Sequence, residues 1–179
     1  MTIETLASTG FTPTHTGLAG IDTRHLKAMR NAGLRACFKR MEDTAWRQEY
    51  VATVRGRQYY NDAASRNINA TWYAVENNPG GVIWITCGIE DEVDYSCMLS
   101  AVHRKVRMIL VLGPAKGLRK AFGSMVPQIE ECATMAEAVK RAYYYDSPDV
   151  TVLFSPATND AAHSTSELAE AFENEVNEL

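Results

Sequence analysis

The sequence has no long hydrophobic run and no excess of basic charge. Its 179 residues carry 18 Lys and Arg against 22 Asp and Glu, a formal net charge of −4. No apolar stretch approaches the ~20 residues of a membrane-spanning helix, and the opening MTIETLASTG lacks the basic and apolar parts of a signal peptide. We therefore predict a cytosolic protein that binds neither nucleic acid nor membrane, since an anionic partner needs a basic surface.

Cysteine and histidine are present, but not in metal-binding patterns. The four histidines are far apart and form neither HExxH nor an i,i+4 pair. The acidic run Glu90–Glu92 with Asp94 offers carboxylates for a divalent cation, but a solvated acidic loop is the prediction we favour. No metal site is predicted. Four cysteines lie in apolar runs without CxxC spacing, which predicts reduced, buried side chains: Cys37, Cys87, Cys97 and Cys132.

Three motifs for phosphate, dinucleotide and acyl chemistry are missing. The chain has no GxxxxGK[ST], no GxGxxG after a strand and no GxSxG. It therefore has no phosphate cradle of its own, no dinucleotide fingerprint and no serine nucleophile, and no catalytic residue is predicted. A nucleotide would need binding groups from another domain or protein.

What the sequence does contain is an alternation of strand-like and helical segments. EYVATV and QYY, joined at Arg55-Gly56, predict a β-hairpin. GGVIWITCG, VRMILVLG and VTVLFSPA are continuously apolar, which is typical of strands buried on both faces of a parallel sheet. Helical patterns separate them. The predicted fold class is therefore α/β: a doubly wound, mostly parallel, Rossmann-like sheet with helices on both faces, preceded by an N-terminal helical segment and the hairpin.

Caps and periodicity set the remaining boundaries. A helix, or a pair broken near Gly33, is expected from Asp22 to about Met41, and a short strand at Val126–Ile129. The domain prediction is a flexible N-terminus at 1–21, a helical segment at 22–46 and the α/β domain at 47–179. Five further helices are expected at Ile68–Glu76, Asp94–Lys105, Leu118–Phe122, Thr134–Tyr145 and from Ser164 onward.

Ligands of such sheets bind beyond the carboxyl ends of the strands. Four segments are expected to meet there: Asn61–Asn67, Cys87–Asp94, Gly113–Lys116 and the residues from Ser155 onward.

Six segments resemble, in order and spacing, the C-terminal domain of the Mur ligases, most closely the D-glutamate-adding members: RQEYVATVRGRQYYND, NINATWYAVE, GVIWITCG, VDYS, VRMILVLG and VTVLFSPA. The resemblance covers about Arg47–Ala157. It implies a domain that closes, with an amino acid, over a central domain carrying the P-loop and most ATP and metal contacts, while a third domain binds the UDP-sugar. Residues 22–46 resemble the end of that central domain and its hinge.

Four positions match nucleotide-facing residues of the family. Arg47 matches an arginine that faces the nucleotide, and Asp62 matches an aspartate near the ribose; Asn61 and Asn67 belong to the same motif as Asp62. The resemblance makes these four candidate nucleotide-binding residues. The alternative is that they only cap and turn the backbone.

Other positions depart from the family pattern. Ala64 and Arg66 stand where the family has lysine and threonine, Asp91 replaces the lysine that would hold the incoming glutamate, and Asp160 replaces a substrate-binding serine. Replacing a cation by a carboxylate beside the substrate's carboxylate turns attraction into repulsion and makes the binding free energy less favourable by roughly 2–8 kcal/mol. D-glutamate is therefore not expected to bind. The candidate ligand-rim residues are Arg66, Asp91, Asp94, Ser155 and Asp160.

Two functions are compatible with this pattern. The first is a degenerate, non-catalytic Mur ligase C-terminal-like module that binds or scaffolds, either with a protein that supplies the P-loop and UDP-binding domains or by self-association. The second is one domain of a split ATP-dependent amide ligase with altered acceptor choice. No cofactor is expected for the chain alone, and ATP and Mg²⁺ only with a partner domain. A stand-alone small-molecule enzyme is disfavoured, because nothing here activates a nucleophile or holds phosphates unaided.

Overall fold

A computed structural model describes residues 23–39, 45–88, 93–147, 149–158 and 163–179. The chain divides into two compact units, Met1–Gly33 and Leu34–Leu179. Of the first unit, the described residues form the start of helix α2 (Thr23–Lys39), which runs through Gly33 without a break. The prediction of a flexible stretch at 1–21 lies outside the described residues, and the assignment of 22–46 to a hinge stays a prediction.

The second unit is built on one six-stranded sheet in the order β1-β2-β6-β3-β4-β5. β1 pairs with β2 antiparallel and every other pairing is parallel, so the predicted mostly parallel α/β fold is confirmed. The predicted hairpin is also confirmed, but it is part of the sheet, because β2 pairs with β6. The strands are β1 (Glu49–Val54), β2 (Arg57–Asn61), β3 (Gly81–Cys87), β4 (Val106–Leu112), β5 (Gln128–Cys132) and β6 (Val150–Phe154).

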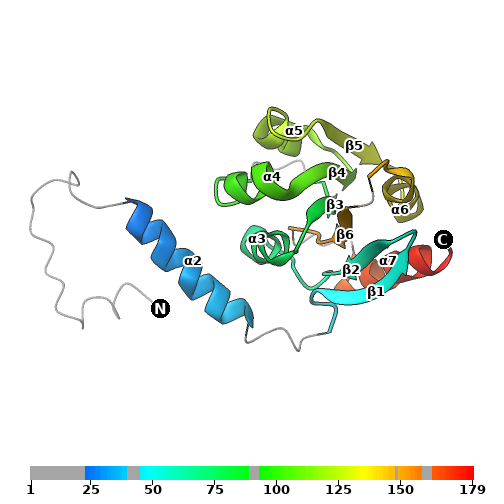
Figure 1. The fold of residues 1–179 in the computed structure, drawn as a ribbon, viewed down its shortest axis with the longest axis horizontal. Helices are drawn as coiled ribbons and strands as arrows, with labels where there is room; N and C mark the ends of the chain where they lie inside the picture. Colours follow the sequence, from blue (N-terminus) through cyan, green and yellow to red (C-terminus); the bar gives the residue numbers. More distant parts are fainter. Residues whose placement is uncertain (1–22, 40–44, 89–92, 148, 159–162) are drawn as a thin grey trace, which may run out of the picture. The chain divides into compact units, whose positions relative to one another are not determined.

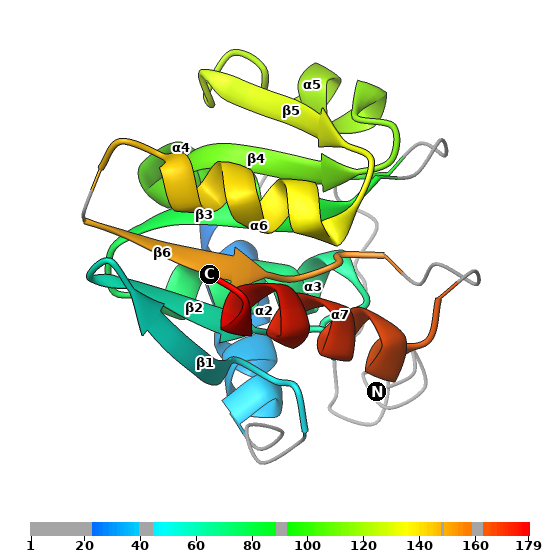
Figure 2. The same cartoon turned by 90° about the vertical axis from the view of Figure 1, so that its right-hand side faces the viewer.

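Helices cover both faces of the sheet, as Figures 1 and 2 show. α3 (Ile68–Asn77), α4 (Leu99–Lys105) and α5 (Lys116–Phe122) lie on one face, and α6 (Met135–Tyr144) and α7 (Thr165–Asn177) on the other. Side chains along a strand alternate between faces. In β3, Trp84 accordingly packs in the core under α3–α5, whereas Ile83 and Ile85 pack under α6 and α7. Burial on both faces explains why the central strands are continuously apolar.

Three predicted boundaries were wrong, one of them at α5, which begins at Lys116 and not at Leu118. The helix expected at Asp94–Lys105 begins only at Leu99, because the Asp94 carboxylate accepts the Ser96 N–H and turns the chain before the helix. The strand expected at Val126–Ile129 is β5, which begins at Gln128, because the Val126 N–H still bonds to the Phe122 carbonyl at the end of α5. The predicted starts of α6 and α7 are confirmed, with Thr134 and Ser164 as N-caps.

The prediction for the cysteines holds in part. All four are free; Cys87 and Cys132 are buried, but Cys97 is only partly buried and Cys37 is exposed on α2. Burial raises the pKa of the Cys132 thiol to about 11, so this side chain behaves as a small apolar residue at neutral pH.

A buried arginine ties the hairpin to the end of α6. The Arg57 guanidinium donates to the carbonyls of Ala142 at 2.5 Å, Tyr143 at 3.1 Å, Tyr145 at 2.7 Å and Ser147 at 2.8 Å. The last carbonyls of a helix have no partner within the helix. Arg57 therefore serves as the C-terminal cap of α6 from a distant strand, a role that no sequence pattern indicated.

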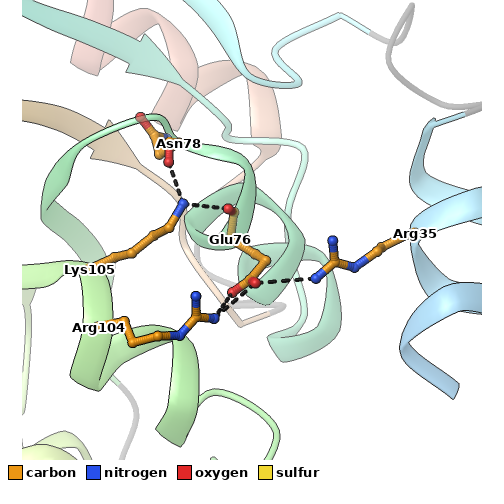
Figure 3. A network of polar contacts seen from close by, with 5 residues as sticks. All are labelled: Arg35, Glu76, Asn78, Arg104 and Lys105. Carbon is orange, nitrogen blue, oxygen red and sulfur yellow. Dashed lines mark hydrogen bonds and ion pairs between the residues drawn. The ribbon is translucent and has the colours of Figure 1, made fainter. Parts of the chain in front are cut away.

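Three cations gather at Glu76, near the end of α3: two pair with its carboxylate and one bonds to its backbone carbonyl (Figure 3). Glu76 pairs with Arg104 of α4 at 2.7 Å and with Arg35 at 3.2 Å, while Lys105 donates to the backbone carbonyls of Glu76 and Asn78. Burial acts to raise the pKa of Glu76, but Arg104, Arg35 and Lys105 together lower it below its ordinary value. This cluster fastens α4 to the end of α3.

Candidate functional site

The carboxyl ends of β2, β3, β4 and β6 meet at one edge of the sheet, as the sequence predicted from their order. β6 lies between β2 and β3, so the carboxyl ends of these three strands are neighbours (Figure 2). Two candidate residues of this edge, Asp91 and Asp160, lie outside the described residues. The others are placed as follows.

Asp62, directly after β2, is fully buried. Its Oδ2 accepts the Ser155 hydroxyl at 2.8 Å, and its Oδ1 accepts the Gln48 N–H at 3.2 Å. Its own backbone N–H bonds to the Phe154 carbonyl at 2.8 Å. Both carboxylate oxygens are thus engaged by groups of the protein itself.

A chain of hydroxyl groups continues from Asp62 into α3. Ser155 Oγ lies 2.7 Å from Thr71 Oγ1, and Thr71 Oγ1 lies 3.4 Å from the Ser65 carbonyl. All three side chains are buried. Ser155, which the sequence placed at the ligand rim, is therefore turned inward, with its hydroxyl between Asp62 and Thr71.

Arg47 lies beside Asp62 and is 7 % exposed. Its Nη1 is 3.5 Å from Ser65 Oγ, and its Nη2 is 3.4 Å from the Ala64 carbonyl. The residues on either side, Trp46 and Gln48, have φ of 55° and 50°. The left-handed region costs a residue with a Cβ about 1–2 kcal/mol, so this short segment is held in place against its own backbone preference.

Burial raises the pKa of Asp62 to about 7. The hydrogen bonds from Ser65 and Ser155 and the positive charge of Arg47 act in the opposite direction but do not outweigh the loss of solvent. Asp62 is therefore a carboxyl group that changes its charge near neutral pH, unlike an ordinary surface aspartate.

Asn61 and Asn67, the other two candidate nucleotide residues, bond within the protein. The Asn61 amide donates to the Ala169 carbonyl at 3.2 Å and to Glu173 Oε1 at 2.7 Å, which ties the end of β2 to α7. Asn67 is the N-cap of α3, accepting the Ala70 N–H at 3.0 Å. Both contacts match the alternative in which these residues cap and turn the backbone.

We expect Asn67→Ala to lower the free energy of unfolding by about 1 kcal/mol, because the first turn of α3 loses its cap. Asn77→Ala, at the exposed last position of the same helix, is the matched control and should change stability by less than about 0.5 kcal/mol. Urea unfolding measures both. Equal stability of the two variants would show that the Asn67 cap does not stabilise α3.

Arg66 and Asp94 are the remaining described rim candidates. Arg66 is partly buried in the loop after β2, and Asp94 is exposed in its turn with Ser96. No group of three or more His, Cys, Asp or Glu that could hold a metal ion occurs among the described residues. In the same part of the chain, no helix is long and apolar enough to cross a membrane.

The end of β3 is closed against the loop after β6. Trp84 Nε1 donates to the Ser155 carbonyl at 2.8 Å, and the Pro156 carbonyl accepts the Thr86 hydroxyl at 2.9 Å and the Cys87 N–H at 3.3 Å. At the position between β3 and β6 where a doubly wound sheet binds its ligand, these protein groups bond to one another. An open cleft lies elsewhere, between α6 and the amino ends of β4 and β5, lined by Met108, Gln128, Tyr144 and Tyr145 among others.

Sequence reasoning did not single out three members of this buried network. Gln48, Ser65 and Thr71 lie in segments that the sequence analysis quoted, but none was named as a candidate, and Gln48 acts through its backbone N–H. One signal in the sequence could have indicated Thr71: it is a polar residue within the otherwise apolar run Ala70–Val75 of α3.

Comparison with known proteins finds similarity to UDP-N-acetylmuramoylalanine–D-glutamate ligases. No protein-family model matches the chain. UDP-N-acetylmuramoylalanine–D-glutamate ligase from Porphyromonas gingivalis is 33 % identical over 155 residues, covering 86 % of this chain and 34 % of the relative. The enzymes of the same name from Christiangramia forsetii and Chlorobium phaeobacteroides are 32 % and 33 % identical, covering 74 % and 78 % of this chain.

This chain carries a Mur ligase C-terminal-like domain. It spans about a third of the length of the curated relatives it matches, 34 %, 30 % and 29 % for these three. A solved domain of a UDP-N-acetylmuramate:L-alanyl-gamma-D-glutamyl-medo-diaminopimelate ligase from Haemophilus ducreyi superposes on 72 % of this chain and 98 % of its own length, with 11 % identity and a TM-score of 0.44. In this Mur ligase-like domain, the buried network of Arg47, Asp62 and Ser155 occupies the carboxyl edge of the sheet.

Proposed function

We propose that the domain is a non-catalytic binding or scaffolding module related to the peptidoglycan precursor ligases. One observation carries the proposal: Arg47, Asp62 and Ser155, at the edge where a ligand would bind, direct their polar atoms at protein groups. Asp62 is 0 % exposed, so a ribose could reach its carboxylate only if the segments that cover it moved apart. By resemblance, Ala64 and Arg66 replace a lysine and a threonine of the family. The loss of these two residues also supports a non-catalytic domain.

Titration of the ¹⁵N-labelled chain with Mg-ATP tests this proposal. We expect no saturable change in the amide shifts of residues 45–67 at millimolar nucleotide. Saturable shifts that disappear in Arg47→Ala but persist in Arg55→Ala, an exposed arginine at the hairpin turn, would overturn it. ADP release by this chain alone, given ATP, the UDP-muramoyl precursor and an amino acid, would overturn it as well.

The second candidate is one domain of a split ATP-dependent amide ligase that acts on a cell-wall precursor with a different acceptor. The side-by-side placement of Arg47 and Asp62 at the carboxyl edge supports it, since both match nucleotide-facing positions by resemblance. Its partner would supply the P-loop, ATP, Mg²⁺ and UDP-sugar contacts.

A complementation assay separates the two candidates. The Porphyromonas gingivalis ligase, shortened by the third that matches this chain, is mixed with the chain, and ADP release is measured with a panel of amino acids. ADP release that needs both proteins, and that Arg47→Ala abolishes, would favour the split ligase. No release with any amino acid, while the intact ligase is active, favours the non-catalytic module.

A further inference from the structure

Helix α2 has an exposed apolar side. Met29 is 59 % exposed, and small exposed residues follow it on the same side of the helix, at about 100° of rotation per residue: Ala32, Gly33 and Ala36. Leu34 and Arg35 lie on the opposite side, where Leu34 packs against the core and Arg35 pairs with Glu76. A large exposed apolar side chain beside small ones is typical of a surface that packs against another protein.

The charge of α2 restricts what can cover this side. The helix contains five Lys and Arg residues and no Asp or Glu. Two such helices repel each other, so a second α2 is a poor partner. An acidic surface is the complement that this charge favours.

A hollow of about 340 Å³ lies between α6 and the end of α7, two helices that pack side by side in Figure 2. Its lining includes Tyr144, which is 66 % exposed, and Leu179, which is 39 % exposed. The described part of the chain exposes four large hydrophobic side chains, and three of them are Met29, Tyr144 and Leu179. The other apolar residues of the hollow come from α6: Ala136, Val139 and Tyr143.

The charge around this hollow is mainly negative. Glu175 and Glu178 line it, together with the cation Lys140. α7 itself contains four Glu residues and no Lys or Arg. The hollow thus combines exposed apolar side chains with an acidic helix, and this combination complements the apolar side and the positive charge of α2.

We propose that α2 of one copy of this chain docks in the hollow between α6 and α7 of a second copy, with Met29 as the apolar anchor. Ala32 and Gly33 have little or no side chain, so the backbone of α2 can approach the hollow closely. Leu34 packs in the core under α3–α5, on the face of the sheet opposite α6 and α7, so the helix that fills a hollow comes from another copy.

The contact is head to tail, because it joins two different surfaces, and each added copy presents one further α2 and one further hollow. A second copy is thereby the partner for the scaffolding function proposed above. The test of this contact is independent of nucleotide, and the Mg-ATP titration can succeed or fail whichever oligomeric state is found.

Sedimentation velocity of the unchanged chain over a range of concentrations is the first test. We expect species larger than a monomer at high concentration. Their apparent dissociation constant should rise about tenfold between about 50 mM and about 500 mM salt, because salt screens the attraction between α2 and α7.

Two substitutions, one on each surface, should each weaken association by about tenfold or more. Met29→Asp removes the anchor and places a carboxylate opposite the acidic α7, and Ala136→Arg fills the hollow and places a cation opposite the basic α2. Asn31→Asp, on the opposite side of α2 from Met29, and Asn177→Arg, at an exposed position of α7 that does not line the hollow, add the same charges. These matched controls should stay within about twofold of the unchanged chain.

Mixing the two variants tests whether the contact is head to tail. Met29→Asp keeps an intact hollow and Ala136→Arg keeps an intact α2, so an equimolar mixture should form a 1:1 pair that grows no further. If two α2 helices met instead, Ala136→Arg would associate as the unchanged chain does and would form no pair with Met29→Asp, which would overturn the proposal. An unchanged chain that stays monomeric at every concentration and salt would overturn it as well.

If either variant fails to fold, the unchanged chain decides. Its Met29 ¹³C-methyl signal and its Tyr144 ring signals should move together as the concentration rises. Movement of one without the other would refute docking of α2 in this hollow.

Discussion

Asp62→Asn should remove a large part of the pH dependence of stability between pH 4 and pH 7. The pKa of Asp62 is about 7 in the folded chain against 3.8 when unfolded, so between these values the folded state binds a proton that the unfolded state does not. Its stabilising contribution is present at low pH and is lost as the pH rises through 7. The loss amounts to roughly 1.4 kcal/mol per pH unit, or about 4 kcal/mol over the whole window.

The measurement is urea unfolding at several pH values, with the unchanged chain, Asp62→Asn and Asp94→Asn compared at each. Asn resembles the neutral carboxyl in shape and hydrogen bonding, so the variant should keep at pH 8 the stability that the unchanged chain has only in acid. Asp94→Asn should follow the unchanged chain, because Asp94 is exposed. Parallel curves for all three would show that burial does not raise the pKa of Asp62.

Acid is thus expected to stabilise the whole fold, because the buried Asp62 carboxyl no longer bears a charge without solvent.

Gly88→Ala should destabilise the domain by about 3 kcal/mol or more. A Cβ at this position would lie 2.3 Å from the Pro114 carbonyl oxygen, 2.8 Å from the Pro114 nitrogen and 2.9 Å from the Gly113 carbonyl carbon. All of these are backbone atoms, which cannot turn aside as a side chain can. The loops after β3 and β4 would have to separate, breaking the bond from the Gly88 N–H to the Leu112 carbonyl.

Gly80→Ala is the matched control, since its Cβ would meet only the Asp149 carbonyl oxygen at 3.6 Å, an ordinary contact. The stability of this variant should be unchanged or higher by up to about 1 kcal/mol, because alanine lowers the conformational entropy of the unfolded chain relative to glycine. Thermal unfolding of both variants measures the difference. If Gly88→Ala is as stable as Gly80→Ala, the close approach of the two loops does not constrain the sheet edge.

The fold could be predicted because its signals are local. GGVIWITCG and VTVLFSPA are continuously apolar, and only a strand covered on both faces can bury such a run. Asn67, Thr134 and Ser164 each begin a helix through a side chain that accepts an N–H three residues later. Boundaries were missed where a competing local bond intervened, as at Asp94, whose carboxylate turns the chain before α4.

The site could be predicted only in part. Strand order placed Asn61–Asn67 and Ser155 at one edge, because the carboxyl ends of parallel strands meet there. Strand order could not say which way the side chains of Asp62 and Ser155 point, since that depends on contacts with Gln48 and Thr71, which come from other segments of the chain.

By itself, the sequence determined the α/β class, the two-faced core and the ancestry of the domain, because each rests on periodicity or on residue identity at matched positions. The tertiary structure decided that Asp62 is buried, that Arg47 lies against it and that Trp46 and Gln48 are strained. The physical reason is that a pKa depends on the solvent and charges around a group, and that a strained backbone persists only where the surrounding structure holds it. Those surroundings come from segments as far apart as Arg47 and Ser155, which meet only when the sheet has formed.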